Sequence, residues 1–133
     1  QRGLVKLLKN VLPDLAVNNG LPIDGLSRDP GNNNAYRVDP LVHPKASVRL
    51  AAFMMEAAED VMAKANEWDV PLYLAHGSAD PICPVAGSDQ FAQRLGSKVT
   101  YKRWDGFYHE THNEPEKDVV IAAMLDWVES QLS

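Results

Sequence analysis

An acid and a histidine in the second half of the sequence have the types and positions that acid–base catalysis requires. Asp80 follows the apolar run of residues 69–75, and His109 follows the alternating run of residues 99–104; both runs are typical of strands. An amphipathic run typical of a helix comes after His109. In a Ser…Asp…His triad the acid accepts the Nδ1–H of the base and fixes its orientation. We therefore predict a hydrogen bond of roughly 2.6 to 3.2 Å between an Asp80 oxygen and His109 Nδ1.

Each of these residues also has a simpler interpretation. The run Ser78-Ala79-Asp80-Pro81 is typical of a turn, and only the pairing with His109 favours a catalytic role for Asp80. His109 is preferred to His112 as the base because it lies closer to the end of the strand. We interpret His112 as a surface or supporting residue. The remaining histidines are interpreted as structural: His43 and His76.

The nucleophile of such a triad is not found in the sequence. A serine elbow needs the pattern G-x-S-x-G, because the strained turn has room only for glycine, and none of the serines has it. Cys83 would need a nearby base and a lowered pKa to act as a nucleophile, and the prolines around it favour a packed or pocket-lining thiol. The sequence does not begin with Met, so we expect the serine to lie upstream of Gln1 and this chain alone to be inactive.

The sequence disfavours a metal centre and a nucleic-acid site. His109 and His112 are one residue short of the spacing in the H-E-x-x-H zinc motif, and Gly106 and Pro115 favour a loop there. The net charge is −5 with no cluster of Lys and Arg, whereas nucleic-acid binding depends on neutralising phosphates. We expect no metal, no organic cofactor and no nucleic-acid partner.

Length and composition indicate one globular domain. The 133 residues, of which 45% are hydrophobic, are enough for a single core. A single cysteine, Cys83, excludes an internal disulfide and slightly favours a reducing compartment. No run approaches the roughly 18 apolar residues of a membrane span.

The sequence predicts helices around two strands. The helices are expected at residues 3–12, at 47–66 with Ser47 as the cap, at 84–95 closed by Gly96, and from Pro115 onward. Residues 13–34 are predicted to be mostly loop, with a short turn starting at Asp29, and residues 39–44 to be extended or turned. Two strands joined by a helix form one β-α-β unit of the α/β class. Because a two-stranded parallel sheet is not stable alone, we expect another polypeptide or residues outside this sequence to complete its edge.

Two longer motifs surround the candidate acid and base. They are Leu74-Ala75-His76-Gly77-Ser78-Ala79-Asp80-Pro81-Ile82-Cys83 and Tyr108-His109-Glu110-Thr111-His112-Asn113-Glu114-Pro115-Glu116-Lys117. Together they resemble the C-terminal half of the monoacylglycerol lipases, which belong to the lysophospholipase and serine-aminopeptidase-like branch of the α/β-hydrolases. Residues 39–43 and 124–128 are also similar to that family, so the resemblance spans about residues 36–133.

This resemblance implies the C-terminal part of an α/β-hydrolase fold, with a mostly parallel sheet flanked by helices and part of a helical cap. Residues 1–45 would be the end of the cap region and the return to the core, and residues 46–133 the C-terminal part of the core. Asp80 would be the acid, His109 the base, and Cys83 a residue close to bound substrate. The implied activity is hydrolysis of a carboxylic ester, such as a monoacylglycerol, by a full-length enzyme that needs the N-terminal half of the fold.

The resemblance also implies a cytoplasmic or membrane-peripheral protein whose cap contacts a lipid surface. Two alternatives stay open. The chain is either a non-catalytic fragment or partner that completes another chain, or part of a different capped α/β-hydrolase, such as an aminopeptidase or an epoxide or haloalkane hydrolase. The residues before Gln1 distinguish them, because G-x-S-x-G selects an esterase, and an aspartate at the elbow selects the last two enzymes.

Overall fold

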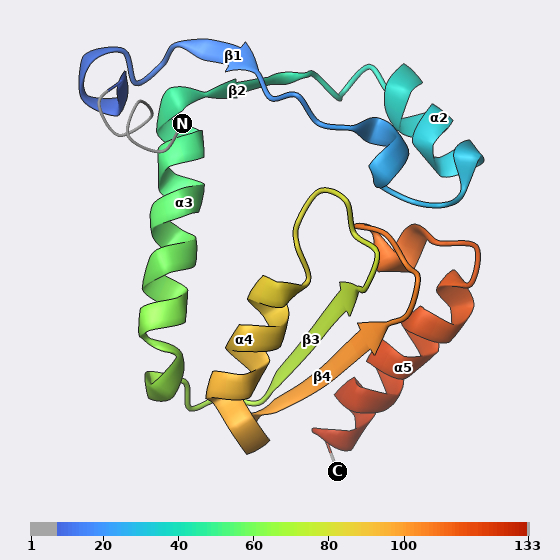
Figure 1. The fold of residues 1–133 in the computed structure, drawn as a ribbon. Helices are drawn as coiled ribbons and strands as arrows, with labels where there is room; N and C mark the ends of the chain where they lie inside the picture. Colours follow the sequence, from blue (N-terminus) through green and yellow to red (C-terminus); the bar gives the residue numbers. More distant parts are fainter. Residues whose placement is uncertain (1–7, 133) are drawn as a thin grey trace.

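The computed structural model describes residues 8–132, which contain the helices α2 to α5, the strands β1 to β4 and several short 3-10 turns (Figure 1). In chain order the helices and strands are β1 (Ala16–Asn18), α2 (Pro30–Val38), β2 (Lys45–Ser47), α3 (Val48–Ala63), β3 (Leu72–Gly77), α4 (Ala86–Leu95), β4 (Val99–Trp104) and α5 (Lys117–Ser130). The turns are η1 (Ile23–Gly25), η2 (Ala65–Glu67), η3 (Gly96–Lys98) and η4 (Thr111–Asn113).

Strands β3 and β4 form the parallel pair that carries the candidate acid and base. Their register runs from Leu72 opposite Val99 to Gly77 opposite Trp104, so both strands end at the same edge. Helix α4 connects them and covers one face, and α5 covers the other (Figure 1). The predicted β-α-β unit is therefore present.

The residue alternation of the two strands explains this layering. On one face, the hydroxyl of Tyr101 donates to Asp89 Oδ1 of α4 at 2.8 Å. On the other face, the ring of Tyr73 packs against Trp127 of α5, with centroids 5.7 Å apart. Successive side chains of a strand point to opposite faces. Alternate residues of the two strands therefore face α4, and the residues between them face α5.

A second sheet, of β1 and β2, was not expected from the sequence. These strands pair antiparallel, with Val17 opposite Ala46, inside or next to segments predicted as loop. Each has only three residues, and Val17 is 45% exposed. A strand this short and this exposed lacks the apolar alternation by which strands are predicted from sequence.

Side-chain caps confirm Ser47 as the predicted helix cap and Asp29 as the start of the predicted short turn, which the structure extends into the helix α2. Ser47 Oγ accepts the backbone N–H of Leu50 at 3.1 Å at the start of α3. At the start of α2, Asp29 Oδ1 accepts the N–H of Gly31 at 2.8 Å. Asn, Asp, Ser and Thr oxygens at this position satisfy N–H groups that have no partner within the helix.

The other boundaries differ from the prediction by a few residues. Helix α3 ends at Ala63 because residues 65–67 form η2, and α5 begins at Lys117 rather than Pro115. Helix α4 ends as predicted before Gly96, whose φ of 59° favours glycine. Of the helix predicted at residues 3–12, residues 8–11 are helical and residues 3–7 lie outside the described part of the chain.

Much apolar surface stays exposed on the helices. The buried apolar residues are few: Leu26, Val48, Ala52, Ala65, Ala92, Leu95, Trp104 and Val120. On α3, by contrast, Phe53 is 64% and Met54 63% exposed, and Val119 of α5 is 60% exposed. Within residues 8–132, no helix combines the length and the hydrophobicity that are needed to cross a bilayer.

Candidate active site

The loops that follow β3 and β4 are joined through their backbones at the carboxyl edge of the sheet. The N–H of Ser78 donates to the carbonyl of Trp104 at 2.7 Å, and the N–H of Ala79 donates to that of Phe107 at 3.0 Å. The Ser78 hydroxyl adds a link, donating to Asp105 Oδ1 at 3.0 Å. The two loops are therefore fixed relative to each other where Asp80 and His109 emerge.

Gly77, the last residue of β3, lets the second loop pass directly against the strand. A Cβ at this position would lie 2.2 Å from the carbonyl oxygen of Tyr108 and 2.3 Å from that of Phe107. No side chain fits at such distances from backbone atoms, so glycine is required here by close approach. Tyr108, the residue before His109, therefore lies directly against the end of β3.

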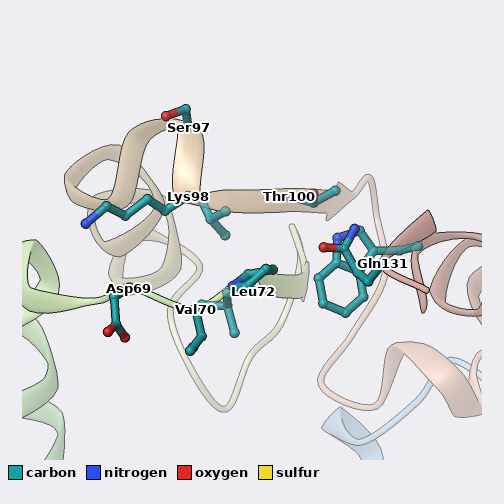
Figure 2. A pocket seen from close by; sticks show the side chains of 10 residues that line it. Asp69, Val70, Leu72, Ser97, Lys98, Thr100 and Gln131 are labelled. Carbon is teal, nitrogen blue, oxygen red and sulfur yellow. The ribbon is translucent and has the colours of Figure 1, made fainter. Parts of the chain in front are cut away.

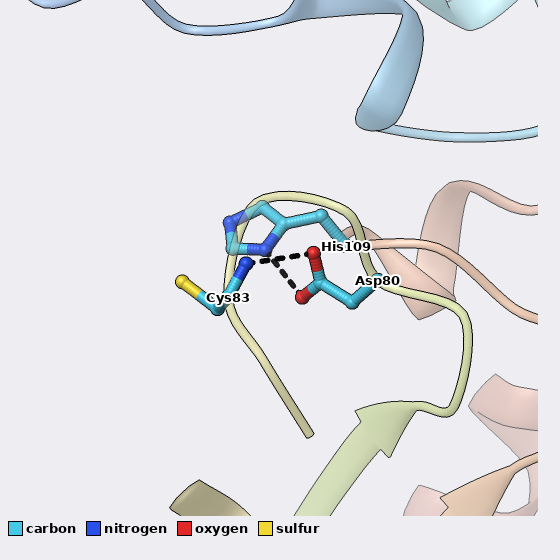
Figure 3. Close-up of side chains that lie close together, drawn as sticks. All are labelled: Asp80, Cys83 and His109. Atoms are coloured by element: carbon cyan, nitrogen blue, oxygen red, sulfur yellow. Dashed lines mark hydrogen bonds and ion pairs between the residues drawn. The ribbon is translucent and has the colours of Figure 1, made fainter. Parts of the chain in front are cut away.

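Asp80 and His109 form the predicted hydrogen bond (Figure 3). His109 Nδ1 lies 2.8 Å from Asp80 Oδ2. An ionised carboxylate only accepts, so Nδ1 carries the proton and Nε2 of the neutral ring is the basic nitrogen. The Asp80 side chain is 1% exposed and the His109 side chain 35%, so the acid is hidden and the imidazole is accessible. This is the division that a histidine base and its orienting acid need.

The turn after β3 keeps the Asp80 carboxylate ionised. Its Oδ1 accepts the backbone N–H of Ile82 at 2.7 Å and that of Cys83 at 2.9 Å. Burial acts to raise the pKa of Asp80, but the hydrogen bonds from Cys83, His109 and Ile82 outweigh it and hold the pKa below its usual value. The carboxylate is therefore charged at neutral pH.

Cys83 lies beside this pair, and its thiol is not activated. Burial, and then the charge of Asp80, raise the pKa of the thiol, which is therefore protonated at neutral pH. This disfavours a nucleophilic role, as the sequence predicted, since the thiolate is the reactive form. Cys83 lines an open hollow of about 1010 Å³ between α3 and α4, and its walls are rich in methionine. Those methionines are Met54, Met55 and Met62.

Asp80, Cys83 and His109 lie close enough together to be examined as metal ligands. Among residues 8–132, one ligand atom each of Asp80, Cys83 and His109 lie within 4.8 Å of one another. The oxygens of Asp80, however, already accept hydrogen bonds from two backbone N–H groups and from His109. The donor set is organised to orient an imidazole.

His76 has a contact that sequence reasoning missed. The sequence predicts a structural role for His76, whereas in the structure its Nε2 lies 3.1 Å from Asp80 Oδ2. The same nitrogen lies 2.9 Å from the carbonyl oxygen of Cys83, and Nδ1 lies 2.7 Å from Ser88 Oγ. A possible signal was the separation of four residues between His76 and Asp80 across a tight turn. By contrast, His112 is exposed in η4.

Sequence reasoning also missed the ion pair that holds the His109 loop from the other side. The Glu114 side chain is fully buried, and its Oε2 accepts from Nε of Arg28 at 2.9 Å and from its backbone N–H at 3.1 Å. Glu114 Oε1 accepts the N–H of Tyr108 at 2.5 Å. The backbone N–H of Glu110 donates to the carbonyl of Leu26 at 2.8 Å. The loop between β4 and α5 is thus clamped to the segment before α2.

Another hollow lies at the opposite end of the parallel strands (Figure 2). It has a volume of about 390 Å³ and contains the first residues of both strands, Leu72 and Val99. Its polar lining includes Asp69, Lys98 and Gln131. Catalytic groups of open α/β sheets gather at the carboxyl ends of the strands, so this hollow is not the candidate site.

The chain is similar to known proteins along most of its length. Residues 1–116 match the family described as serine aminopeptidase, S33. The chain belongs to this family. A monoacylglycerol lipase of Mycolicibacterium smegmatis is 35% identical over 131 residues, covering 97% of this chain and 46% of that protein. An uncharacterized abhydrolase domain-containing protein of Dictyostelium discoideum is 36% identical over 129 residues, covering 95% of this chain and 14% of that protein.

A solved structure of a relative shows the fold. The crystal structure of Paleococcus ferrophilus monoacylglycerol lipase superposes with a TM-score of 0.93 at 32% identity, covering 97% of this chain and 51% of that one. This serine aminopeptidase S33 family member therefore has the C-terminal portion of an α/β-hydrolase fold, as the sequence predicted. The chain spans about half the length of the two monoacylglycerol lipases that it matches.

Proposed function

We propose that this chain supplies the acid and the base of a serine hydrolase that cleaves carboxylic esters, with monoacylglycerols as the substrate. The observation that carries the proposal is the hydrogen bond of 2.8 Å between a buried Asp80 and an accessible His109. The nucleophilic serine would come from a segment before Gln1. The chain spans only about half of the related lipases, which is consistent with such a segment.

The proposed mechanism uses His109 twice. Its Nε2 takes the proton of the serine hydroxyl while Oγ attacks the ester carbonyl, and it gives that proton to the glycerol oxygen as the ester bond breaks. His109 Nε2 then takes a proton from water, whose oxygen attacks the acyl-serine carbonyl, and returns that proton to the serine Oγ as the acyl–oxygen bond breaks and the fatty acid leaves. Asp80 keeps its charge throughout and stabilises the imidazolium.

The choice of a lipid ester has two supports. The relative from Mycolicibacterium smegmatis that is 35% identical is named a monoacylglycerol lipase. In addition, the hollow beside Cys83 is lined by methionines and by Ile82, which are side chains that adapt to flexible apolar groups. We propose that Cys83 lies near the bound acyl chain.

The rest of the chain would have roles set by the same fold. We propose that residues 1–45 are the end of the cap and the return to the core, and that residues 46–133 are the C-terminal part of the core. The exposed apolar side chains of α3 and α5, such as Phe53 and Val119, would be covered by the N-terminal half. Val11, Leu12 and Leu15, all at least 44% exposed, would bring the cap to a lipid surface.

Two measurements test this function. The sequence before Gln1 decides the reaction class: G-x-S-x-G supports the esterase, an aspartate at the elbow supports an epoxide or haloalkane hydrolase, and no preceding segment supports a non-catalytic or complementing chain. The second is hydrolysis of p-nitrophenyl esters by the isolated 133 residues, for which we expect no turnover and a tendency to aggregate. Turnover blocked by a serine-directed phosphonate that labels a serine within the chain would contradict the proposal.

A further inference from the structure

We propose that His76 is a positioning residue for Asp80, so that the acid of the site is held by two imidazoles rather than one. This inference rests on the function proposed above. His76 Nε2 and His109 Nδ1 both approach the same oxygen, Asp80 Oδ2, at 3.1 and 2.8 Å. His76 comes from within β3, and His109 comes from the loop after β4.

The surroundings of His76 determine which of its nitrogens carries the proton. The carbonyl oxygen of Cys83, 2.9 Å from Nε2, can only accept, so Nε2 carries the hydrogen and donates it to this carbonyl. The polarised N–H also lies 3.1 Å from the charged Asp80 Oδ2, as an electrostatic contact. Nδ1 of the neutral ring then accepts the hydroxyl of Ser88, on α4, at 2.7 Å. Helix α4 thereby fixes the tautomer that presents an N–H to the acid.

This N–H fixes a part of Asp80 that the backbone leaves free. Both backbone donors, the N–H groups of Ile82 and Cys83, bind Oδ1. A carboxylate whose hydrogen bonds all go to Oδ1 can still move its Oδ2. His109 Nδ1 binds this Oδ2. The His76 N–H sets the place of Oδ2, and with it the orientation of the catalytic imidazole.

Burial separates the roles of the two histidines. The His76 side chain is 14% exposed and that of His109 is 35% exposed. Both ring nitrogens of His76 already have partners, so His76 has no free nitrogen with which to take a proton from a nucleophile. It acts through Asp80 and does not touch the reacting atoms.

Three substitutions in the full-length protein separate positioning from simple packing. His76→Phe keeps a ring but removes both nitrogens, and His76→Gln restores an N–H near the position of Nε2. Ser88→Ala removes the donor that fixes the tautomer. His43→Gln is the matched control, since His43 is exposed and lies outside the site.

The first measurement is the low-field proton NMR signal of His109 Nδ1–H, assigned by its loss in His109→Ala. We expect His76→Phe to shift or broaden this signal, Ser88→Ala to change it in the same direction but less, and His76→Gln and His43→Gln to keep it. Ester hydrolysis should show a fall in kcat on the order of 10²-fold for His76→Phe with little change in KM, and recovery in His76→Gln.

The inference is overturned if His76→Phe is folded and leaves both the NMR signal and kcat unchanged. If His76→Phe does not fold, the unchanged signal of Ser88→Ala overturns it instead. A loss of kcat that His76→Gln fails to restore also contradicts positioning through the N–H. Failure of the proposed function can be distinguished from failure of this inference. If the wild-type protein hydrolyses no ester, the NMR signal of His109 Nδ1–H still shows whether His76 orients Asp80 and His109.

Discussion

Gly77 and Tyr108 are in direct backbone contact, because a Cβ on Gly77 would lie 2.2 Å from the Tyr108 carbonyl oxygen. This contact places the residue before His109 on the end of β3, a few residues before Asp80. Asp80 and His109 are therefore positioned by two backbone segments that lie in direct contact.

Replacing Gly77 tests that contact. Gly77→Ala should destabilise the full-length protein by roughly 1–3 kcal/mol or more, because backbone atoms must move to admit the methyl group. It should also lower ester hydrolysis by displacing His109. Urea unfolding measures the first effect. The control is Gly87→Ala in α4, where a Cβ meets nothing within 4 Å, and it should be neutral or slightly stabilising. Equal stability of the two variants would contradict the account.

The buried carboxylate of Glu114 should be needed for the His109 loop. Glu114→Ala leaves Arg28 and the N–H of Tyr108 without their buried acceptor, and the free energy of unfolding should fall by about 3 kcal/mol. Glu116→Ala is the control, because Glu116 also pairs with Arg28 but is half exposed, and its removal should cost less than about 1 kcal/mol. Similar losses in both variants would show that the buried acceptor is unimportant.

Alkylation of Cys83 should be slow at neutral pH. The raised pKa predicts a half-maximal iodoacetamide rate above pH 9.0, the ordinary value for this group, as measured by mass spectrometry across pH. Asp80→Asn should lower the pKa and speed the reaction at a fixed pH, because it removes the neighbouring negative charge. A half-maximal rate below pH 9.0 in the unmodified protein would show that the thiol is activated.

The ionised carboxylate of Asp80 should contribute to the free energy of unfolding at neutral pH, and this contribution should be lost in acid. Its pKa in the folded protein lies below the ordinary value of 3.8, so the carboxylate stabilises the fold above that pH, and the contribution is lost as the pH falls through the lower folded value. The difference in unfolding free energy between wild type and Asp80→Asn should therefore shrink on acidification from pH 6 to about 3. Asp126→Asn on exposed α5 is the comparison. A difference that grows towards low pH would contradict a lowered pKa.

The sequence was sufficient to predict the hydrogen bond between Asp80 and His109 but not the contacts that support it. The runs at residues 69–75 and 99–104 predicted strands because they are apolar or alternating, and Asp80 and His109 follow from the rule that parallel strands end at one edge. The bounds of β4 are as predicted. The other strand is shifted to Leu72–Gly77, because Asp69 to Pro71 precede the pairing with β4.

The missed contacts depend on distance in the chain and on the geometry of turns. Arg28 and Glu114 are 86 residues apart, and no local pattern marks a buried carboxylate with so distant a partner. His76 reaches Asp80 only because the turn after Gly77 folds back on the strand. Sequence alternation gives the face on which His76 lies, but not the path of that turn.

The most direct test of the central claim is the kcat/KM of the full-length protein for a monoacylglycerol, with substitutions at the two neighbouring histidines. If His109 is the base, His109→Ala should lose activity by orders of magnitude, and Asp80→Asn on the order of 10⁴-fold, while His112→Ala should lose far less. A protein in which His112→Ala abolishes hydrolysis and His109→Ala retains it would contradict the account.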